Sequence, residues 1–258
     1  MGSGTGTGSR TGADTGTGAG TGMATGTGTG TAAGAGTGRE FDLSGRQSWP
    51  TMFFYRRWRD HAAEAPGILE YLLQLRKAAA TNIASGVAPT SKSMQGLFES
   101  DFDLFKRDHP GLRKLVAWVE QTVRQAVCVA NGNRERPERV RVEIPDSWCH
   151  VSNGGGFHDA HTHGGCSWCG IFYLAAGDAR ASDATGAGNG VSRFYSPVNA
   201  GGLVQDYGNA YLAHSRVDIT PTDGLLLLFP SYLMHSGLPY AGERDRVVIA
   251  FNSCSYLD

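Results

Sequence analysis

Between residues 139 and 252 the chain alternates short apolar stretches with turns that contain glycine or proline. Val140, Val142 and Ile144 alternate with charged residues, which is the period-two pattern of a half-buried strand. Many short strands with such turns are typical of a β-sandwich or barrel, so this part predicts a mainly β domain. Further strands are predicted at 147–151, 170–175, 192–195, 216–219, 225–229 and 246–252.

Two helices are predicted ahead of these strands, where they would cover one face of the β domain. Pro66 is expected to open the first helix, because proline is favoured at the first helical position. The second begins at Asp108-His109-Pro110 and ends at Asn131-Gly132-Asn133. A short strand is expected at 52–55, and the small and polar residues of 78–100 predict a loop. The residues that give the first helix its apolar face are Ile68, Leu69, Leu72, Leu73 and Leu75.

Residues 1–38 consist almost entirely of glycine, threonine and alanine. Without large side chains to bury, such a segment cannot offset the entropy lost on ordering. We therefore predict a disordered tail at 1–38 and a single domain at 39–258, with helical support at 60–130.

The charge and the cysteines restrict the class of protein. The 23 basic and 24 acidic residues balance, so the sequence indicates neither a nucleic-acid nor a membrane-surface partner. No apolar run approaches the roughly 18–20 residues that span a bilayer, and the N-terminus lacks the pattern of a signal peptide. An odd count of five cysteines then favours free thiols, so we expect an intracellular, cytoplasmic protein.

Histidines gather at two places beside predicted strands. His161 and His163 are separated by one residue, so on a strand both imidazoles point to the same face. His235 follows a buried strand that ends in Phe229-Pro230. Three imidazoles on one side of a metal would leave positions open for a substrate and oxygen. Asp159 and His158 are further candidates, either to complete the metal site or to orient its ligands.

Arg246 begins the predicted strand that follows His235. If these two strands are neighbours, the guanidinium points into the same cavity as the histidines. Arginine binds a carboxylate through two parallel hydrogen bonds, as a dicarboxylate that chelates the metal would need.

The same cluster allows a second interpretation that uses thiols. Cys166 and Cys169 form a C-x-x-C pair close to His161 and His163, and the four together would be a Cys₂His₂ zinc site. These ligands would be unusually close in sequence for a structural zinc site, and Cys169 directly precedes a buried strand. A small core thiol is the simpler role for Cys169.

Five motifs in this order resemble the 2-oxoglutarate/Fe(II) oxygenase family, over residues 147–252. No single motif is specific, whereas the five in sequence are fairly specific. They are Ser147-Trp148, His161-Thr162-His163, Gly170-Ile171-Phe172-Tyr173-Leu174, Phe229-Pro230-Ser231-Tyr232-Leu233-Met234-His235, and the strand from Arg246 to Asn252.

The resemblance implies a double-stranded β-helix, or jelly-roll, core at 138–254 with non-haem Fe(II) in its mouth. It implies that His161, His163 and His235 bind the metal and that Arg246 holds the distal carboxylate of the co-substrate, 2-oxoglutarate. Tyr173 is expected to reach the same co-substrate from a neighbouring strand. The implied reaction is hydroxylation or a related C–H oxidation, with 2-oxoglutarate converted to succinate and CO₂.

Two other functions remain open at the level of the sequence. One is a cupin-like three-histidine metalloenzyme that does not use 2-oxoglutarate, and the other is a non-catalytic, zinc-stabilised β-sandwich that binds a partner. The segments 176–191 and 198–215 are candidates for a substrate lid. The sequence selects neither a small-molecule nor a protein substrate, nor an oligomeric state.

Overall fold

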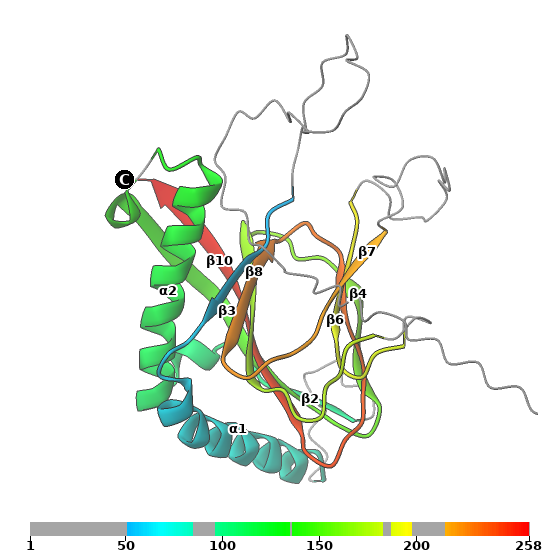
Figure 1. The fold of residues 1–258 in the computed structure, drawn as a ribbon. Helices are drawn as coiled ribbons and strands as arrows, with labels where there is room; N and C mark the ends of the chain where they lie inside the picture. Colours follow the sequence, from blue (N-terminus) through cyan, green and yellow to red (C-terminus); the bar gives the residue numbers. More distant parts are fainter. Residues whose placement is uncertain (1–50, 85–95, 135, 183–186, 198–214, 258) are drawn as a thin grey trace, which may run out of the picture. The chain divides into compact units, whose positions relative to one another are not determined.

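The strands form two antiparallel sheets that face each other (Figure 1). The computed structural model describes residues 51–84, 96–134, 136–182, 187–197 and 215–257. The chain divides into two units, Met1–Ser44 and Gly45–Asp258, and every described residue belongs to the second. The tail predicted at 1–38 lies outside the described residues.

The large sheet has the order β1 (Phe54–Arg57), β8 (Leu225–Pro230), β5 (Trp168–Ala175), β10 (Arg246–Leu257), β3 (Val140–Ser152) and β2 (Leu97–Glu99). The small sheet has the order β4 (Gly156–His161), β9 (His235–Tyr240), β6 (Ser192–Tyr195) and β7 (Arg216–Ile219).

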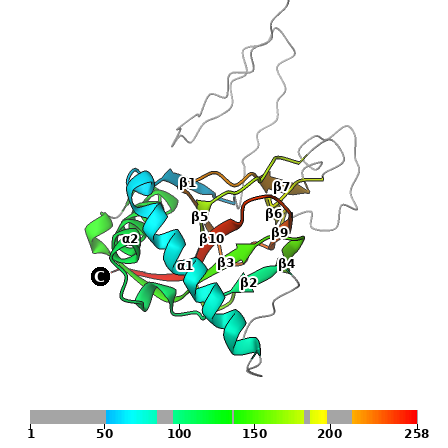
Figure 2. The same ribbon diagram turned by 90° about the horizontal axis from the view of Figure 1, so that it is seen from below.

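Two long helices cover the large sheet. Helix α1 (His61–Ala84) and helix α2 (Pro110–Ala130) lie on the face turned away from the small sheet, as Figures 1 and 2 both show. Two short 3₁₀ helices, η1 (Leu104–Lys106) and η2 (Pro137–Arg139), flank α2 in the chain. The mainly β jelly roll with N-terminal helices, predicted from the sequence, is confirmed. No helix among the described residues is long and apolar enough to cross a membrane.

The main hydrophobic core lies between the helices and the large sheet. It joins helix residues such as Ile68 and Leu115 to strand residues such as Phe172 and Ile249, and all four are fully buried. Burial of each such side chain contributes about 1.5–3 kcal/mol, so this core holds the helices on the sheet.

Side-chain alternation divides the large sheet into a core face and a cavity face. In β10, Val247, Ile249 and Phe251 pack under the helices, whereas Arg246 and Val248 line the cavity between the sheets. Successive side chains of a strand point to opposite faces. Arg246, which was predicted to point into the cavity from the start of its strand, thus points away from the helical core.

A β-bulge in β3 changes which face its residues present. Asn252 of β10 pairs with Asp146, and Cys254 pairs with Glu143, so β3 carries one extra residue at Ile144-Pro145. Proline has no N–H for the ladder and is accommodated at bulges. The two strands predicted at 140–144 and 147–151 are therefore one continuous strand, and the bulge is what ends the first alternation.

After the bulge, Cys149 and Val151 pack in the helical core, and Trp148, His150 and Ser152 line the cavity. Without the extra residue the even-numbered side chains would continue toward the helices, as Val140 and Val142 do. The bulge thus places a histidine in the cavity.

The predicted start of α1 is wrong. The helix begins at His61, and the carbonyl of Asp60 accepts hydrogen bonds from the backbone N–H groups of Ala63 and Glu64 at 3.1 and 3.0 Å. Pro66 lies inside the helix, where the ring removes one hydrogen bond. The buried apolar face of α1 holds the helix together despite that loss.

The loop predicted at 78–100 is only partly correct. Helix α1 continues to Ala84, and Leu97–Glu99 forms the edge strand β2, while residues 85–95 lie outside the described part. Strands β4 and β9 were also not identified as separate strands from the sequence, although they carry two of the predicted histidines.

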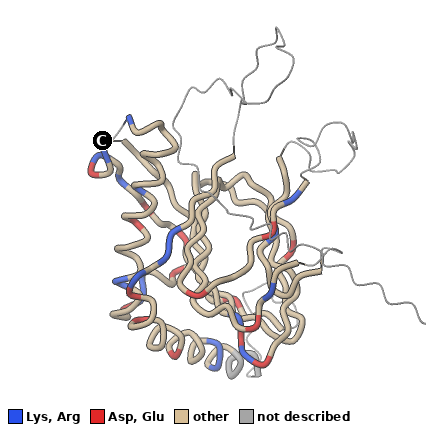
Figure 3. Tube along the Cα trace, in the orientation of Figure 1, with Lys and Arg blue, Asp and Glu red and all other residues tan. Residues whose placement is uncertain are grey.

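The predicted ends of α2 are confirmed. His109 is the N-cap, and its Nδ1 accepts a hydrogen bond from the backbone N–H of Leu112 at 3.3 Å; Asn131 is the C-cap. Acidic and basic residues alternate along α2, whereas in α1 Glu64 and Glu70 precede Arg76 and Lys77 (Figure 3).

Candidate metal centre

The three predicted histidines come together at one end of the small sheet. Ligand nitrogens of His161, His163 and His235 all lie within 4.8 Å of one another. His161 ends β4, His235 begins β9, and the two are Cα partners across the strand pair. His163 lies two residues beyond β4, where its backbone N–H donates to the carbonyl of Ser231 at 3.0 Å. That hydrogen bond ties the third imidazole to the turn that precedes His235.

Backbone carbonyls orient two of these rings. Nδ1 of His161 lies 2.6 Å from the carbonyl oxygen of Asp159, and Nδ1 of His235 lies 3.0 Å from that of Leu233. A carbonyl only accepts, so each Nδ1 carries the proton and donates it. Each Nε2 then keeps its lone pair, which is the arrangement of a metal-binding imidazole.

The three imidazoles are uncharged at neutral pH. Burial lowers the pKa of His161 to about 4 and that of His235 to about 3, and it also lowers the pKa of His163. Metal binding requires neutral imidazole, so no proton has to be displaced near pH 7.

Aromatic side chains fix the His235 ring. Phe194 is stacked on it with ring centroids 5.6 Å apart, and Phe229 meets it edge-on at 4.7 Å. The side chain is 5% exposed. Packing on two sides removes alternative rotamers, so His235 is held rigidly.

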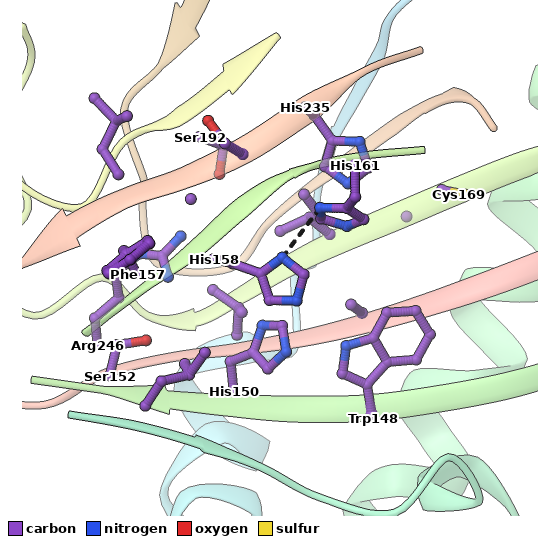
Figure 4. Close-up of a pocket in the computed structure, with 18 of the residues that line it drawn as sticks. Trp148, His150, Ser152, Phe157, His158, His161, Cys169, Ser192, His235 and Arg246 are labelled. Carbon is purple, nitrogen blue, oxygen red and sulfur yellow. Dashed lines mark hydrogen bonds between the residues drawn. The ribbon is translucent and has the colours of Figure 1, made fainter. Parts of the chain in front are cut away.

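Arg246 lies in the same cavity as the three histidines. Figure 4 shows it with His161 and His235. It is 6% exposed, and its Nε has no hydrogen-bond partner among the described residues. Burial lowers the pKa of Arg246, and only Tyr173 and Tyr240 oppose this among the described side chains. A buried guanidinium without a carboxylate is costly, so the cavity is suited to an anion.

Tyr173 was predicted to reach 2-oxoglutarate, but its hydroxyl already has a hydrogen-bond partner in the protein. Its ring lies under Arg246, with the guanidinium carbon 5.9 Å from the ring centroid, and it is fully buried. Its hydroxyl donates to Oγ of Ser192 at 2.9 Å. Ser192 lines the cavity, so the tyrosine supports a cavity hydroxyl as well as the arginine.

The alternative zinc site is not formed. Sγ of Cys166 and Sγ of Cys169 are 3.8 Å apart, and Cys169 also donates to Oδ1 of Asn252 at 3.2 Å. Neither thiol belongs to the metal-capable clusters found among the described residues. Cys169 is the second residue of the inner strand β5 and packs with Phe229, which accounts for its burial.

A second cluster of possible ligands was not predicted as a site. Glu99, His150 and His158 offer ligand atoms within 4.8 Å of one another. Burial alone would raise the pKa of Glu99, but hydrogen bonds from His150 and His158 lower it to about 2. Burial lowers the pKa of His150. The alternation 149–151 places His150 opposite Cys149 and Val151, but the bulge at Ile144-Pro145 decides which of the two faces lines the cavity.

Much of the two segments predicted as substrate lids, 176–191 and 198–215, lies outside the described residues. Residues 198–214 and 183–186 are not described. In the remainder of the first segment, Arg180 and Asn189 form an isolated β-bridge. The predicted lid role is therefore not tested.

Comparison with known proteins gives one family match, which lies in the strand region. Residues 146–252 match the model of the family described as "Putative 2OG-Fe(II) oxygenase". The matched range contains the three histidines, Tyr173 and Arg246. A search of curated proteins finds no match.

Solved structures with a similar course of the chain were also found. A prolyl hydroxylase from Trichoplax adhaerens, in complex with a hypoxia inducible factor peptide fragment, is 16% identical (78% of this chain, 83% of that chain, TM-score 0.49). HygX from Streptomyces hygroscopicus, with nickel and 2-oxoglutarate bound, is 13% identical (79% and 83%, TM-score 0.46). A Pseudomonas putida prolyl-4-hydroxylase is 16% identical (78% and 91%, TM-score 0.43). At these identities the likeness assigns no residue role or substrate to this chain.

Proposed function

We propose that this chain, whose residues 146–252 belong to the 2OG-Fe(II) oxygenase family, binds Fe(II) through His161, His163 and His235 and 2-oxoglutarate through Arg246. The protein is an enzyme of that class, with 2-oxoglutarate as co-substrate. Its reaction is hydroxylation or a related oxidation of a substrate C–H bond.

The observation that carries the residue assignment is the position of Arg246. A buried cation whose Nε lacks a partner among the described residues shares one cavity with three neutral imidazoles. The imidazoles suit a divalent transition metal, and the guanidinium suits a carboxylate. A small dicarboxylate that reaches both would satisfy both requirements.

The protein contributes position and protection from water. Iron, when bound, supplies the activation of oxygen, which no side chain provides. The carbonyls of Asp159 and Leu233 hold two imidazoles with Nε2 available, and Arg246 orients the co-substrate carboxylate. Phe194 and Phe229 exclude water from the inner side of His235.

We place the prime substrate in a second cavity of about 600 Å³ that borders His161 and His163. Phe102, Trp148 and Phe157 form its apolar walls, and its acidic residues include Asp146 and Asp159. No lysine or arginine lines it among the described residues. This lining favours a neutral or cationic substrate over an anionic one.

We also infer an intracellular, cytoplasmic location from the cysteines. None of the five cysteines, all of which are described, is in a disulfide, and Cys128, Cys149 and Cys169 are buried. Cysteines outside disulfides are typical of reducing compartments. Fractionation of cells that produce the full chain tests this inference, and recovery from an oxidising compartment would contradict it.

The test of the proposed function is anaerobic addition of Fe(II) and 2-oxoglutarate to the full chain. A visible charge-transfer band is expected, and admission of O₂ should yield succinate. His235→Ala should abolish the band, while Arg246→Ala should require more 2-oxoglutarate. Bound iron with neither a band nor succinate would instead favour the cupin-like metalloenzyme, for which the three-histidine set without an acid is the specific observation.

A further inference from the structure

A second group of side chains that could hold a metal ion lies beside the three-histidine cluster. Glu99 comes from the edge strand β2, His150 from β3 and His158 from β4. Glu99 and His150 are Cα partners, and the rings of His150 and His158 are stacked with centroids 5.1 Å apart. Three strands from two sheets thus meet at one point.

We propose that Glu99, His150 and His158 form a second site for a divalent transition-metal ion, adjacent to the site of His161, His163 and His235. Two imidazoles and one carboxylate suit iron, zinc or manganese better than magnesium or calcium, which prefer oxygen ligands. The inference does not depend on the use of 2-oxoglutarate.

The spacing of the ligand atoms fits one ion. Two atoms that each lie about 2.1 Å from an ion are about 3.0 Å apart in octahedral and about 3.4 Å apart in tetrahedral geometry. Oε2 of Glu99 is 2.7 Å from Nε2 of His150 and 3.7 Å from Nε2 of His158. For these two pairs, ion binding requires shifts of only about a few tenths of an ångström. The nitrogens of His150 and His158 lie within 4.8 Å of each other.

The carbonyl of Asp159 can hold His158 in the form that a metal requires. It lies 3.3 Å from Nδ1 of His158 and 2.6 Å from Nδ1 of His161, and one carbonyl oxygen can accept two hydrogen bonds. The two Nδ1 atoms are 3.0 Å apart, a distance at which two N–H groups would repel each other, so metal binding requires the His158 ring to turn away from His161. Both rings then present Nε2 to a metal. The two rings are neighbours, with centroids 4.2 Å apart, so the two ions would lie close together (Figure 4).

The site is both protected and reachable. The side chains of Glu99 and His150 are each 12% exposed, and that of His158 is 25% exposed. Glu99 and His158 line the larger cavity, through which an ion can enter. Glu99 supplies one partly buried negative charge, and a cation at this point would balance that charge.

A competing arrangement uses the same residues without a metal. Nδ1 of His158 lies 3.0 Å from Nδ1 of His161, drawn as a dashed line in Figure 4. If His158 accepts a hydrogen bond from His161 there, its Nε2–H points toward Glu99. The three residues would then only position His161, and the number of bound ions separates the two cases.

The experiment counts ions bound to the full chain. Protein stripped with a chelator is titrated anaerobically with Co(II), and bound metal is measured after desalting. The wild-type chain is expected to bind two equivalents, Glu99→Gln one, and His235→Ala the one held by the second site. Glu143→Gln, an exposed carboxylate-to-amide change on β3, should still bind two.

The outcomes separate this inference from the proposed function. One equivalent or fewer in the wild-type chain, or two retained in Glu99→Gln, overturns the second site even if 2-oxoglutarate is turned over. Two equivalents without 2-oxoglutarate turnover support the site and count against the oxygenase assignment. If Glu99→Gln does not fold by circular dichroism, His158→Asn removes a partly exposed ligand and should likewise bind one equivalent.

Discussion

His161 and His235 are Cα partners across the β4–β9 pair, with ring centroids 4.3 Å apart. One residue ends its strand and the other begins its strand, so the antiparallel register brings both imidazoles to the same end of the small sheet. Because a slip of one residue would turn a side chain to the opposite face, the proposed metal site depends on this register. Two of the three proposed ligands lie in the small sheet, and His163 lies outside a strand.

Arg246 provides the first prediction. Arg246→Ala should weaken 2-oxoglutarate binding by roughly 30-fold or more, because the loss of one partner of a buried charge pair costs about 2–5 kcal/mol. Arg246→Lys should recover part of the affinity, since the charge remains but the two parallel hydrogen bonds do not. Binding is measured by titration of the charge-transfer band or by calorimetry.

Arg244 is the matched control for that measurement. It lies on the same hairpin, is exposed, and forms an ion pair with Asp178 at 2.9 Å. Arg244→Ala should leave 2-oxoglutarate affinity within about twofold of wild type, because exposed pairs contribute little. Equal losses in the two alanine variants would refute a specific role for Arg246.

The sequence predicted those parts of the fold and the site that depend on a local pattern of residues. A period of two and glycine turns predicted most strands of the β domain and the strand that Arg246 begins. The single strand assumed for His161 and His163 was wrong, because β4 ends at His161. The assumption that the strands of His235 and Arg246 are neighbours was also wrong, because β9 and β10 belong to different sheets. The family resemblance added the ligand set and the co-substrate, which spacing had left open.

Glu99 and His150 show what local pattern cannot supply. Glu99 lies in a strand of three residues, too short to give a periodic signal, and its partner is fixed only by the β2–β3 register. His150 faces the cavity because the bulge at Ile144-Pro145 shifts the alternation by one residue. The sequence shows Pro145, but the extra residue is recognised only from the pairing of β3 with β10, which the sequence does not reveal.

Gly190 provides the second prediction. It has φ +68°, and a Cβ there would lie 2.7 Å from the Tyr240 ring and 3.0 Å from Cδ of Arg246. Gly190→Ala should lower the free energy of unfolding by about 2–4 kcal/mol, from backbone strain plus overpacking. It should also weaken 2-oxoglutarate binding, because the alanine pushes on the arginine. Urea unfolding and the ligand titration measure the two effects.

Gly154 isolates the backbone contribution. It also has positive φ, +57°, but a Cβ there would meet nothing within 4 Å. Gly154→Ala should therefore lower the free energy of unfolding by only about 1–2 kcal/mol and leave co-substrate affinity unchanged. If both variants lose stability and affinity equally, the contact of Gly190 with Arg246 has no functional role.

The buried histidines predict how stability depends on pH. The folded-state pKa is about 4 for His161 and about 3 for His235, whereas an unfolded histidine has a pKa of about 6.5. Below about pH 6.5 the unfolded chain therefore binds more protons than the folded chain. The free energy of unfolding of the metal-free protein should therefore fall as the pH decreases from about 6.5 toward the folded-state pKa values. The fall should be up to about 1.4 kcal/mol per pH unit for each histidine.

Urea unfolding in the presence of a chelator, at several values between about pH 7 and pH 5, measures this slope. Glu99 has a pKa of about 2 and contributes little in that window. His235→Gln should make the slope shallower, because it removes one group that is neutral when folded and protonated when unfolded. An unchanged slope in that variant would show that His235 does not titrate as its burial requires.

His163 provides the last prediction. It is the only one of the three histidines outside a strand, and its backbone is held by the carbonyl of Ser231. His163→Asp would create the set of two histidines and one carboxylate found in many non-haem iron enzymes. We expect His163→Asp to bind Fe(II) and to form the charge-transfer band with 2-oxoglutarate. His163→Leu has no donor atom and should bind Fe(II) at least about tenfold more weakly. Because the two variants alter the same backbone position, equal iron affinity in both would show that His163 is not a ligand.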